Sequence, residues 1–528
     1  MTPGARLAPR GMVTAPHHLA ASAGASVLRD GGNAVEAMVA AAATIAVVYP
    51  HMNSIGGDGF WLISRPGSPP IGIEACGRAA ALATPEAYRA LGHQAIPTRG
   101  PLAANTVAGA ISGWKAALQW SNARLPIARL LEDATFYARE GVPVTQSQVM
   151  YTSRFASELA PQPGFAASFL RDEAVPTAGS LQKLPALART LARLARHGLD
   201  DFYRGELAHA MSAELTRLGS FVRGSDLAQH AAREVVPLSV DLSVGTAHNL
   251  PPPTQGVASL MILAIFDRIR QGIEAESFDH VHRLVEATKQ AFRVRNRHVA
   301  DPDHMRVAAD TFLASRALDE AAHAIDARRA QPWPEPPIKG DTVWMGACDR
   351  DGCMVSYIQS VYWEFGSGVV LEDTGVTWQN RGASFSLDPA SHVALAPGRR
   401  PFHTLNPALA RLRDGREMVY GNMGGDGQPQ SQAAVFRRYA MFGQDLQRAV
   451  SAPRWLLGRT WGDMSVSLKI ESRLDAAVVD ALRDAGHDVE TIEPWSDLVG
   501  HAGALVRHPD GTIAGASDPR SDGAVAAL

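Results

Sequence analysis

Two apolar runs near the start of the chain predict helices, and a strand-like apolar run follows them. Residues 19–28 and 34–48 are rich in small apolar side chains and are separated by a pair of glycines, which typically end a helix. Asn33 is well placed to cap the second helix. The glycine-rich stretch 54–59 and the apolar stretch 60–63 then predict a tight turn that leads into a strand.

The middle of the chain, from about 125 to 335, has a mostly helical pattern. Its clearest helix is expected at 280–298, where apolar residues recur on one helical face. These residues are Val281, Leu284, Val285, Ala291 and Phe292. Helical spacing returns later, near 432–442 and 474–485.

A proline-rich segment separates this helical region from a region of strands. Residues 331–337 contain four prolines in seven positions, which predicts a stiff, extended and exposed linker. Strand-like runs at 342–348 and 353–360 flank the turn residues 349–352, so we expect a β-hairpin. Mixed helices and strands in this order predict a layered α/β fold.

Composition narrows the class of protein. The 528 residues exceed one ordinary hydrophobic core, so two domains or one large layered unit are expected. A net charge of −3 gives no basic footprint for nucleic acid or an anionic membrane. The apolar run 37–48 is too short to span a bilayer, and 1–12 lack a signal-peptide pattern. Three cysteines without a framework spacing suit a reducing compartment, so we expect a cytoplasmic protein.

Several familiar catalytic motifs are missing from the sequence. There is no His-Glu-x-x-His, and the cluster 301–304 is too compact for a metal-ligand set and reads as a capped turn. A Gly-x-Ser-x-Gly elbow is also missing, and Gly366-Ser367-Gly368 is spaced as a turn. The loop 54–59 precedes a strand, whereas phosphate loops open helices. We therefore expect neither a metal nor an organic cofactor.

The segment after the proline-rich linker carries a specific resemblance. Gly340-Asp341-Thr342, the hairpin and Phe365-Gly366-Ser367-Gly368 resemble the start of the small subunit of the gamma-glutamyltransferase family. These enzymes are N-terminal-nucleophile hydrolases that cut themselves into two subunits. Further motifs of the family follow in order along nearly the whole chain: Gly31–Val35, Ile55–Phe60, Gly100–Leu102, Pro251–Pro253, Ala300–Asp303, Gly424-Gly425, Ala452–Arg454 and Asp518–Arg520.

This resemblance implies an architecture and a cleavage site. It implies a four-layer αββα sandwich with a large subunit, 1–341, and a small subunit, 342–528. Cleavage between Asp341 and Thr342 would leave the two pieces associated as a heterodimer, alone or paired further.

The chemistry of threonine agrees with a role for Thr342 as the nucleophile. A hydroxyl is a poor nucleophile at neutral pH and needs a base within hydrogen-bond reach. A terminal Thr342 supplies its own α-amine, whose pKa of roughly 7.7–8.0 lies near cellular pH. The resemblance also places Ser360 as a second hydroxyl beside the nucleophile. It places Gly424 and Gly425 as the glycines whose N–H groups form the oxyanion hole.

The positions that bind glutamate in the family differ in this chain. Tyr362 replaces an Asn, Arg381 a Gln or Glu, and Ser384 the Asp that holds the substrate ammonium group. His403 and Thr404 stand where two serines usually bind the α-carboxylate. The early arginine of the family has no match in register, because Cys76 occupies its place and Arg78 follows two residues later.

These differences predict a substrate that has a carboxylate but no free amino group. Without the acidic residue, a buried substrate ammonium would have no partner. Arg381, next to Asn380, adds a planar group that binds carboxylates in a bidentate manner. The pattern is similar to the oxamate amidohydrolase branch of the family, which works in purine-ring catabolism and releases oxalate and ammonia. A surface or inter-subunit ion pair is the alternative interpretation of Arg381.

Three other functions fit parts of the pattern. The chain could be a γ-glutamyl transferase or glutathione hydrolase, or an acylase for bulkier dicarboxylic side-chain amides. A non-enzymatic alternative is a processed scaffold that has lost the glutamyl site.

Overall fold

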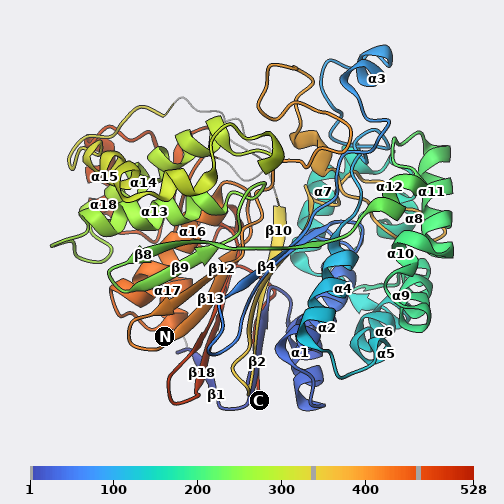
Figure 1. Ribbon diagram of the computed structural model, residues 1–528, viewed down its shortest axis with the longest axis horizontal. Coiled ribbons are helices and arrows are strands. Elements are labelled where there is room, and N and C mark those ends of the chain that lie inside the picture. The colour runs from blue at the N-terminus through green and yellow to red at the C-terminus, as the bar shows by residue number, and fades with distance from the viewer. Residues whose placement is uncertain (1–3, 334–340, 459–464) are drawn as a thin grey trace.

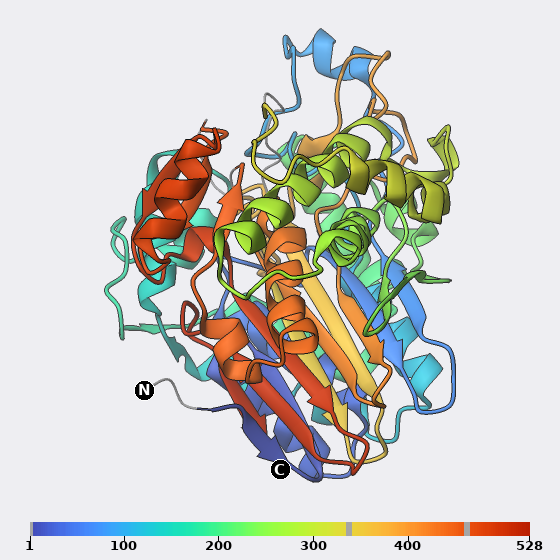
Figure 2. The same ribbon diagram turned by 90° about the vertical axis from the view of Figure 1, so that its left-hand side faces the viewer.

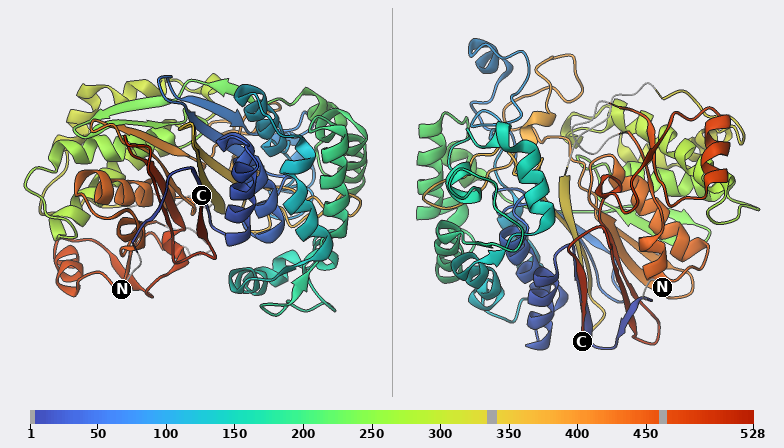
Figure 3. Two further views of the ribbon diagram at one scale, coloured as in Figure 1. Left: turned by 90° about the horizontal axis from the view of Figure 1, so that it is seen from below. Right: turned by 180° about the vertical axis from the view of Figure 1, so that it is seen from behind.

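The structure, a computed structural model, describes residues 4–333, 341–458 and 465–528 and has a mixed α/β fold. Two seven-stranded antiparallel sheets lie against each other in its centre, with helices on their outer sides (Figure 1). The view from below in Figure 3 shows the sheets between the two groups of helices. The α/β class expected from the sequence is therefore confirmed.

The first sheet combines strands from both ends and the middle of the chain. Its order is β1 (Arg6–Ala8), β18 (Ile513–Ser517), β17 (Ala502–Arg507), β13 (Glu417–Asn422), β12 (Ala408–Leu412), β9 (Gly245–Asn249) and β8 (Leu238–Leu242).

The second sheet has the predicted hairpin at its centre. Its order is β19 (Ala524–Ala527), β2 (Gly11–Ala15), β10 (Asp341–Asp349), β11 (Met354–Tyr362), β3 (Asp58–Ser64), β4 (Ile71–Ala75) and β7 (Arg233–Val235). A three-stranded sheet contains β14 (Trp455–Leu457), β15 (Leu468–Glu471) and β16 (Val489–Ile492), and β5 (Val142–Pro143) pairs with β6 (Leu181–Gln182).

The helices divide between the two sheets. The first sheet is covered by helices that include α13, α16 and α17, which face the viewer in Figure 2. This side contains α13 (Gly256–Ile269), α14 (Phe278–His298), α15 (Ser315–His323), α16 (Gly427–Phe436), α17 (Leu446–Ser451) and α18 (Ala476–Asp484).

The second sheet is covered by α1, α2 and α4, and smaller helices pack outside them. This side contains α1 (His18–Arg29), α2 (Ala34–Val48), α3 (Pro85–Ala90), α4 (Ala110–Ser121), α5 (Ile127–Leu130), α6 (Glu132–Glu140), α7 (Gln146–Leu159), α8 (Phe165–Phe169), α9 (Pro185–His197), α10 (Asp201–Arg204), α11 (Glu206–Leu218) and α12 (Gly224–Gln229).

Helix α2 shows how the local sequence positions the core. Asn33 caps it through the N–H groups of Val35 and Glu36, and Glu36 in turn accepts from the N–H of Asn33. All its residues are buried, because it lies between the second sheet and α1, α4 and α6. The small alanine side chains allow this close approach on every face.

A separate apolar core lies between the two sheets. Phe60 and Ile358 contribute from the second sheet, and Leu409, Val419 and Leu505 contribute from the first. The two inner faces therefore bury each other without an intervening helix.

The structure confirms most of the helices and strands expected from the sequence. The region from 125 to 335 is mostly helical, as predicted, and additionally contains β7, β8 and β9 within 233–249. The short alternating pattern of these strands is less distinct than that of the long helices on either side. Most of the predicted linker at 331–337 lies outside the described residues. Among the described helices, none combines the length and apolar character needed to cross a bilayer.

Candidate active site

Thr342 lies at an irregularity at the start of the central strand β10. Asp341 pairs with Tyr362 and Val343 with Gln359, so the register between β10 and β11 shifts at Thr342. The Thr342 side chain is buried, and its hydroxyl donates to the carbonyl of Gln359 at 3.0 Å. Such irregularities redirect a side chain out of the normal strand alternation. The side chain of Thr342 is therefore oriented outside the alternation that the following residues of the strand obey.

Ser360 lies on the neighbouring strand, between Gln359 and the partner of Asp341. Its hydroxyl accepts from the N–H of Tyr362 at 2.8 Å, and in the sheet it pairs with Asp58 of β3. Both predicted hydroxyl residues therefore lie at the same end of the hairpin.

Arg381 is held over Tyr362 near this end of the hairpin. It begins the short 3-10 helix η3 (Arg381–Ser384), and its guanidinium carbon is 4.1 Å from the centre of the Tyr362 ring. The arginine is fully buried, and none of its three guanidinium nitrogens has a hydrogen-bond partner among the described residues. Burial lowers its pKa to about 10, so it remains a cation at neutral pH. A buried cation of this kind favours an anionic ligand.

Tyr362 itself has an unusual backbone. Its φ is +84°, a conformation that is disfavoured for a bulky residue. Strain of this kind persists when the surroundings enforce it and is frequent at functional sites. Here it places the tyrosine ring under the Arg381 guanidinium.

Asp58 and His403 complete a buried group of ionisable residues next to Arg381. One Asp58 oxygen accepts from the N–H groups of Gly77 at 2.9 Å and Gly109 at 3.0 Å and from the Gln379 amide at 3.1 Å. The other oxygen is 3.5 Å from His403 Nε2. Burial raises the pKa of Asp58 to about 7, although these hydrogen bonds and Arg381 oppose the shift. Burial, with a smaller effect from Arg381, keeps the pKa of His403 well below its usual value.

The glycine pair 424–425 forms a turn between β13 and α16. Gly424 and Gly425 have φ values of +103° and +41°, which glycine adopts readily. Within the part of the chain that the structure describes, neither N–H donates a hydrogen bond. Both amides therefore have no acceptor in that part of the chain, and the oxyanion-hole role that the family resemblance implies stays a prediction.

A buried chain of polar groups supports this turn. Gln255 donates to the carbonyl of Gly425 at 3.0 Å and to that of Thr404 at 2.7 Å. Arg295 donates to Gln255 Oε1 at 2.8 Å and lies 2.7 Å from Asp426 Oδ1. Because Gln255 holds both carbonyls, the turn and the 403–404 segment keep a fixed relative position.

Trp344 connects β10 to the strand that precedes the glycine turn. Its buried indole packs between the sheets so closely that a Cβ at Gly421 or Gly503 would overlap it. Its Nε1 donates to Ser356 Oγ at 2.9 Å. Trp344 thus packs beneath the site and brings Gly421, three residues before Gly424, against the strand that contains Thr342.

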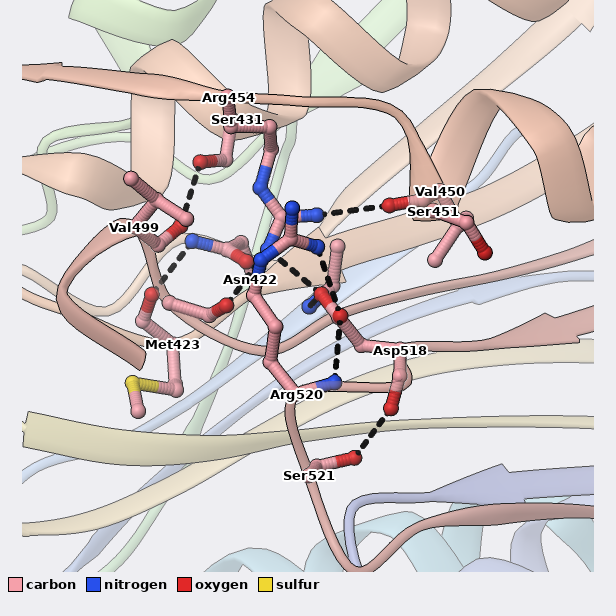
Figure 4. Close-up of polar contacts among 12 residues, drawn as sticks. Asn422, Met423, Ser431, Val450, Ser451, Arg454, Val499, Asp518, Arg520 and Ser521 are labelled. Atoms are coloured by element: carbon pink, nitrogen blue, oxygen red, sulfur yellow. Dashed lines mark hydrogen bonds and ion pairs between the residues drawn. The ribbon is translucent and has the colours of Figure 1, made fainter. Parts of the chain in front are cut away.

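A second buried network lies beside Asn422 and Met423, the residues that precede the turn (Figure 4). Arg454 binds the Asp518 carboxylate and the carbonyl of Gly500, and Arg520 donates to Asp518 at 2.9 Å. Asn422 bonds the carbonyl of Met423 just before the turn. Two motifs that are distant in sequence, 452–454 and 518–520, therefore meet next to the glycine pair.

The remaining predicted site residues have different environments. The Thr404 hydroxyl is buried without a partner among the described residues. Asn380 uses its amide within the protein, accepting from the N–H of Trp363 at 3.1 Å and donating to the carbonyl of Thr98 at 2.8 Å.

Arg78 is exposed, donates to the carbonyl of Gly398 at 2.8 Å and borders a cavity of about 480 Å³. The exposed Arg78 thus differs from the buried Arg381, whereas Cys76 is buried and acts to raise the pKa of Arg381.

Asp58, Gln255 and Arg295 were missed by sequence reasoning. Asp58 lies in the glycine-rich loop that was interpreted only as a tight turn, and an acidic residue before an apolar strand was the available signal. Gln255 and Arg295 lie far from Gly425 in sequence, so their contacts have no local signal.

Comparisons with known proteins agree with this geometry. Residues 20–528 match the gamma-glutamyltranspeptidase family model. The chain is 55% identical to the oxamate amidohydrolase proenzyme of Klebsiella pneumoniae over 520 residues, covering 98% of each protein. It is 37% identical to a glutathione hydrolase-like proenzyme of Bacillus subtilis, again over 98% of each. The structure of a cephalosporin acylase from Bacillus halodurans superposes with a TM-score of 0.91 at 33% identity, covering 100% of this chain and 97% of the acylase.

These matches span almost the whole chain and include all the elements that carry Thr342, Arg381 and the glycine turn. They confirm the resemblance drawn from the sequence, including its oxamate amidohydrolase branch. The chain belongs to the gamma-glutamyltranspeptidase family.

Proposed function

We propose that this protein is a self-processing amidohydrolase that converts oxamate to oxalate and ammonia. The observation that carries the proposal is the buried guanidinium of Arg381, which has no hydrogen-bond partner among the described residues and stacks on Tyr362. In oxamate the carboxylate is bonded directly to the amide carbonyl, so its cationic partner must lie close to the nucleophile. The 55% identity to an oxamate amidohydrolase proenzyme supports the same substrate.

Processing would create the active form. The Thr342 hydroxyl would attack the carbonyl of Asp341, and the resulting ester would be hydrolysed to give subunits 1–341 and 342–528. The two subunits would stay associated, because β10 and β11 of the small subunit lie between β2 and β3 of the large subunit in one continuous sheet. In this proposal the four layers are those of an N-terminal-nucleophile hydrolase.

Catalysis would use the new N-terminus. The Thr342 α-amine takes the hydroxyl proton as the oxygen attacks the oxamate amide carbonyl. The N–H groups of Gly424 and Gly425 stabilise the tetrahedral oxyanion. The intermediate then expels ammonia, with the proton returned from the amine, and leaves an oxalyl ester on Thr342. Water, deprotonated by the same amine, hydrolyses the ester and releases oxalate.

The buried ionisable residues would determine which substrate binds. Arg381 binds the carboxylate, and Ser384 stands where the family has the acidic partner of a substrate ammonium group. His403 would be neutral, because its pKa is well below neutral pH, and can offer a hydrogen bond without adding charge. A cytoplasmic location and a role in purine-ring breakdown accompany this proposal.

The deciding experiment compares three substrates with the processed protein. We expect oxamate to be hydrolysed with a kcat/KM at least about 100-fold above that for a γ-glutamyl anilide or a glutaryl side-chain amide. Efficient turnover of the anilide without turnover of oxamate would favour a γ-glutamyl transferase or hydrolase. Turnover of the glutaryl amide alone would favour an acylase like the structurally similar cephalosporin acylase. No turnover of any substrate by fully processed protein would favour a scaffold.

A further inference from the structure

A compact group of ligand-type side chains lies well outside the site described above. His282 and Glu286 are four residues apart on α14, and His487 lies between α18 and β16. Side chains with this spacing project from the same face of a helix. All three are buried, and one ligand atom from each lies within 4.8 Å of the other two. Histidine nitrogens and a carboxylate at this spacing are typical ligands of zinc and related ions.

The hydrogen bonds of His282 leave Nδ1 as the nitrogen that can bind a metal ion. Its Nε2 lies 2.8 Å from the carbonyl of Asp326, and a carbonyl can only accept, so Nε2 carries the proton. The unprotonated Nδ1 then faces His487 Nε2 at 2.8 Å. Ligating histidines typically bind a carbonyl or carboxylate through their second nitrogen in this way.

We infer that His282, Glu286 and His487 form a binding site for a divalent transition-metal ion of the zinc type. A small separation of the two imidazoles, which are now joined by a hydrogen bond, lets both nitrogens bind one ion about 2.0–2.1 Å away. Three protein ligands leave one coordination position for water.

Glu286 can act as a ligand while it keeps its present contacts. Its Oε1 accepts from Lys289 at 2.7 Å, and its Oε2 accepts from the N–H of Gln331 at 3.2 Å. Each carboxylate oxygen has a second lone pair for a metal ion. Lys289 also donates to the carbonyl of Gln331, so its positive charge stays close and weakens the binding of a cation. Replacing Lys289 therefore tests directly whether a cation binds at this site.

The location indicates what the ion would connect. His282 and Glu286 belong to the part of the chain before Thr342, and His487 belongs to the part after it. Asp326 lies shortly before the proline-rich linker and Gln331 is its first residue, and both contact this group. A bound ion would therefore join the end of the large subunit to the small subunit. This role rests on the proposed processing, whereas metal binding itself does not.

Cobalt titration of the whole protein tests the site. Protein treated with a chelator and then titrated with Co²⁺ should bind one equivalent per chain and show the visible absorption of four-coordinate Co²⁺. His282→Gln and His487→Gln should each weaken binding by at least about 100-fold, the upper end of the loss seen on removing a group that merely supports a ligand. His209→Gln, a change at an exposed histidine on α11, should leave the affinity unchanged.

A second variant keeps the test decisive if the histidine variants unfold. Lys289→Met removes the opposing charge without removing a ligand, so it should raise Co²⁺ affinity by about tenfold or more. Circular dichroism checks that each variant is folded, and oxamate hydrolysis by Lys289→Met checks the proposed function separately. Less than stoichiometric Co²⁺ uptake would overturn the inference. Equal affinity in wild type and His487→Gln, or in wild type and Lys289→Met, would overturn it as well.

Discussion

The guanidinium carbon of Arg381 lies 4.1 Å from the centre of the Tyr362 ring, and Tyr362 pairs with Asp341 across the β10–β11 ladder. The buried cation is thus connected through one aromatic residue to the bond between Asp341 and Thr342. In the proposed mechanism, a carboxylate held there lies close to Thr342 and not at the far end of a long pocket. This relationship links the chemistry of Thr342 to the size of the substrate.

Replacing Arg381 should weaken oxamate binding. Arg381→Lys keeps the charge but loses the planar pair of donors, and we expect KM to rise by about tenfold. Arg381→Met removes the charge and should lower kcat/KM by about 100-fold, because a hydrogen bond to a charged group contributes about 1.5–3 kcal/mol. Steady-state hydrolysis of oxamate measures both effects.

The matched control for these variants is Arg316→Met, a change at a surface arginine that is 91% exposed. It should leave kcat/KM within a factor of two of wild type. If Arg381→Met hydrolyses oxamate as efficiently as this control, Arg381 is not the carboxylate-binding residue.

Asp58 should make oxamate binding depend on pH. Burial raises its pKa to about 7, so the carboxyl group is protonated in acid and becomes an anion as the pH rises through 7. The ionised form would repel the substrate carboxylate and partly neutralise Arg381. We expect KM to rise by roughly fivefold to tenfold from pH 6 to pH 8, equivalent to about 1 kcal/mol of like-charge repulsion in the site.

Asp58→Asn is the corresponding test, because the asparagine oxygen can still accept the three hydrogen bonds of the native residue. The variant should have a KM that changes less than twofold over the same pH range. Its kcat should still fall in acid, because the Thr342 α-amine must be unprotonated to act as a base. A KM in Asp58→Asn that rises with pH as in wild type would contradict this explanation.

The features that could be predicted from sequence are those with local causes. The cap of α2 at Asn33 and the hairpin before and after 349–352 depend on neighbouring residues, and both occur in the structure. Thr342 was found through a motif, because a threonine at the start of a strand has no distinctive local pattern. Its proposed role therefore depended on the family resemblance.

The missed features depend on contacts between distant residues. The hydrogen bonds from Gln255 to Gly425 and from Gln379 to Asp58 join residues more than 150 positions apart. Burial also changes the pKa of a residue, and the sequence alone does not indicate that an aspartate in a glycine-rich loop has a pKa near 7. For the same reason, the group of His282, Glu286 and His487 appeared only when α14 and the β16 region were brought together.

Gln255 should affect the rate more than substrate binding. Gln255→Leu removes the two hydrogen bonds that hold the carbonyls of Gly425 and Thr404, so the oxyanion turn loses its fixed position. We expect kcat to fall by about tenfold to 100-fold, with KM within threefold of wild type. The reason is that the fixed turn stabilises mainly the transition state. Gln148→Leu, which removes a buried amide on α7, is the control. Equal losses in both variants would indicate a general effect on folding.

Thr342 should be required for both processing and hydrolysis. Intact mass spectrometry of wild type should give two polypeptides that meet between Asp341 and Thr342, whereas Thr342→Ala should stay at the full 56.3 kDa. Thr342→Ser keeps a hydroxyl and should still be processed, although more slowly. Complete processing of Thr342→Ala would contradict the mechanism, and so would a full-length wild type after long incubation.

Asp518 should be essential for stability because it joins two buried arginines next to the glycine turn. Its carboxylate binds Arg454 and Arg520 and accepts from the N–H of Ala502 at 2.7 Å. Asp518→Asn leaves Arg454 without its carboxylate partner, while Arg520 keeps Glu471, so the free energy of unfolding should fall by about 3–5 kcal/mol. Denaturant unfolding measures the loss, and Asp373→Asn, at an exposed aspartate, should change it by less than about 0.5 kcal/mol.

The pH dependence of stability gives this prediction a second, independent test. Arg454 and Arg520, together with the N–H of Ala502, hold the pKa of Asp518 far below its usual value despite the opposing effect of burial. The folded state therefore binds this proton less readily than the unfolded state, in which the pKa is about 3.9. The stabilisation is fully present above that value and is lost as the pH falls below it. Wild type should thus lose stability more steeply than Asp518→Asn below about pH 4, and parallel curves would show that Asp518 is not the group responsible.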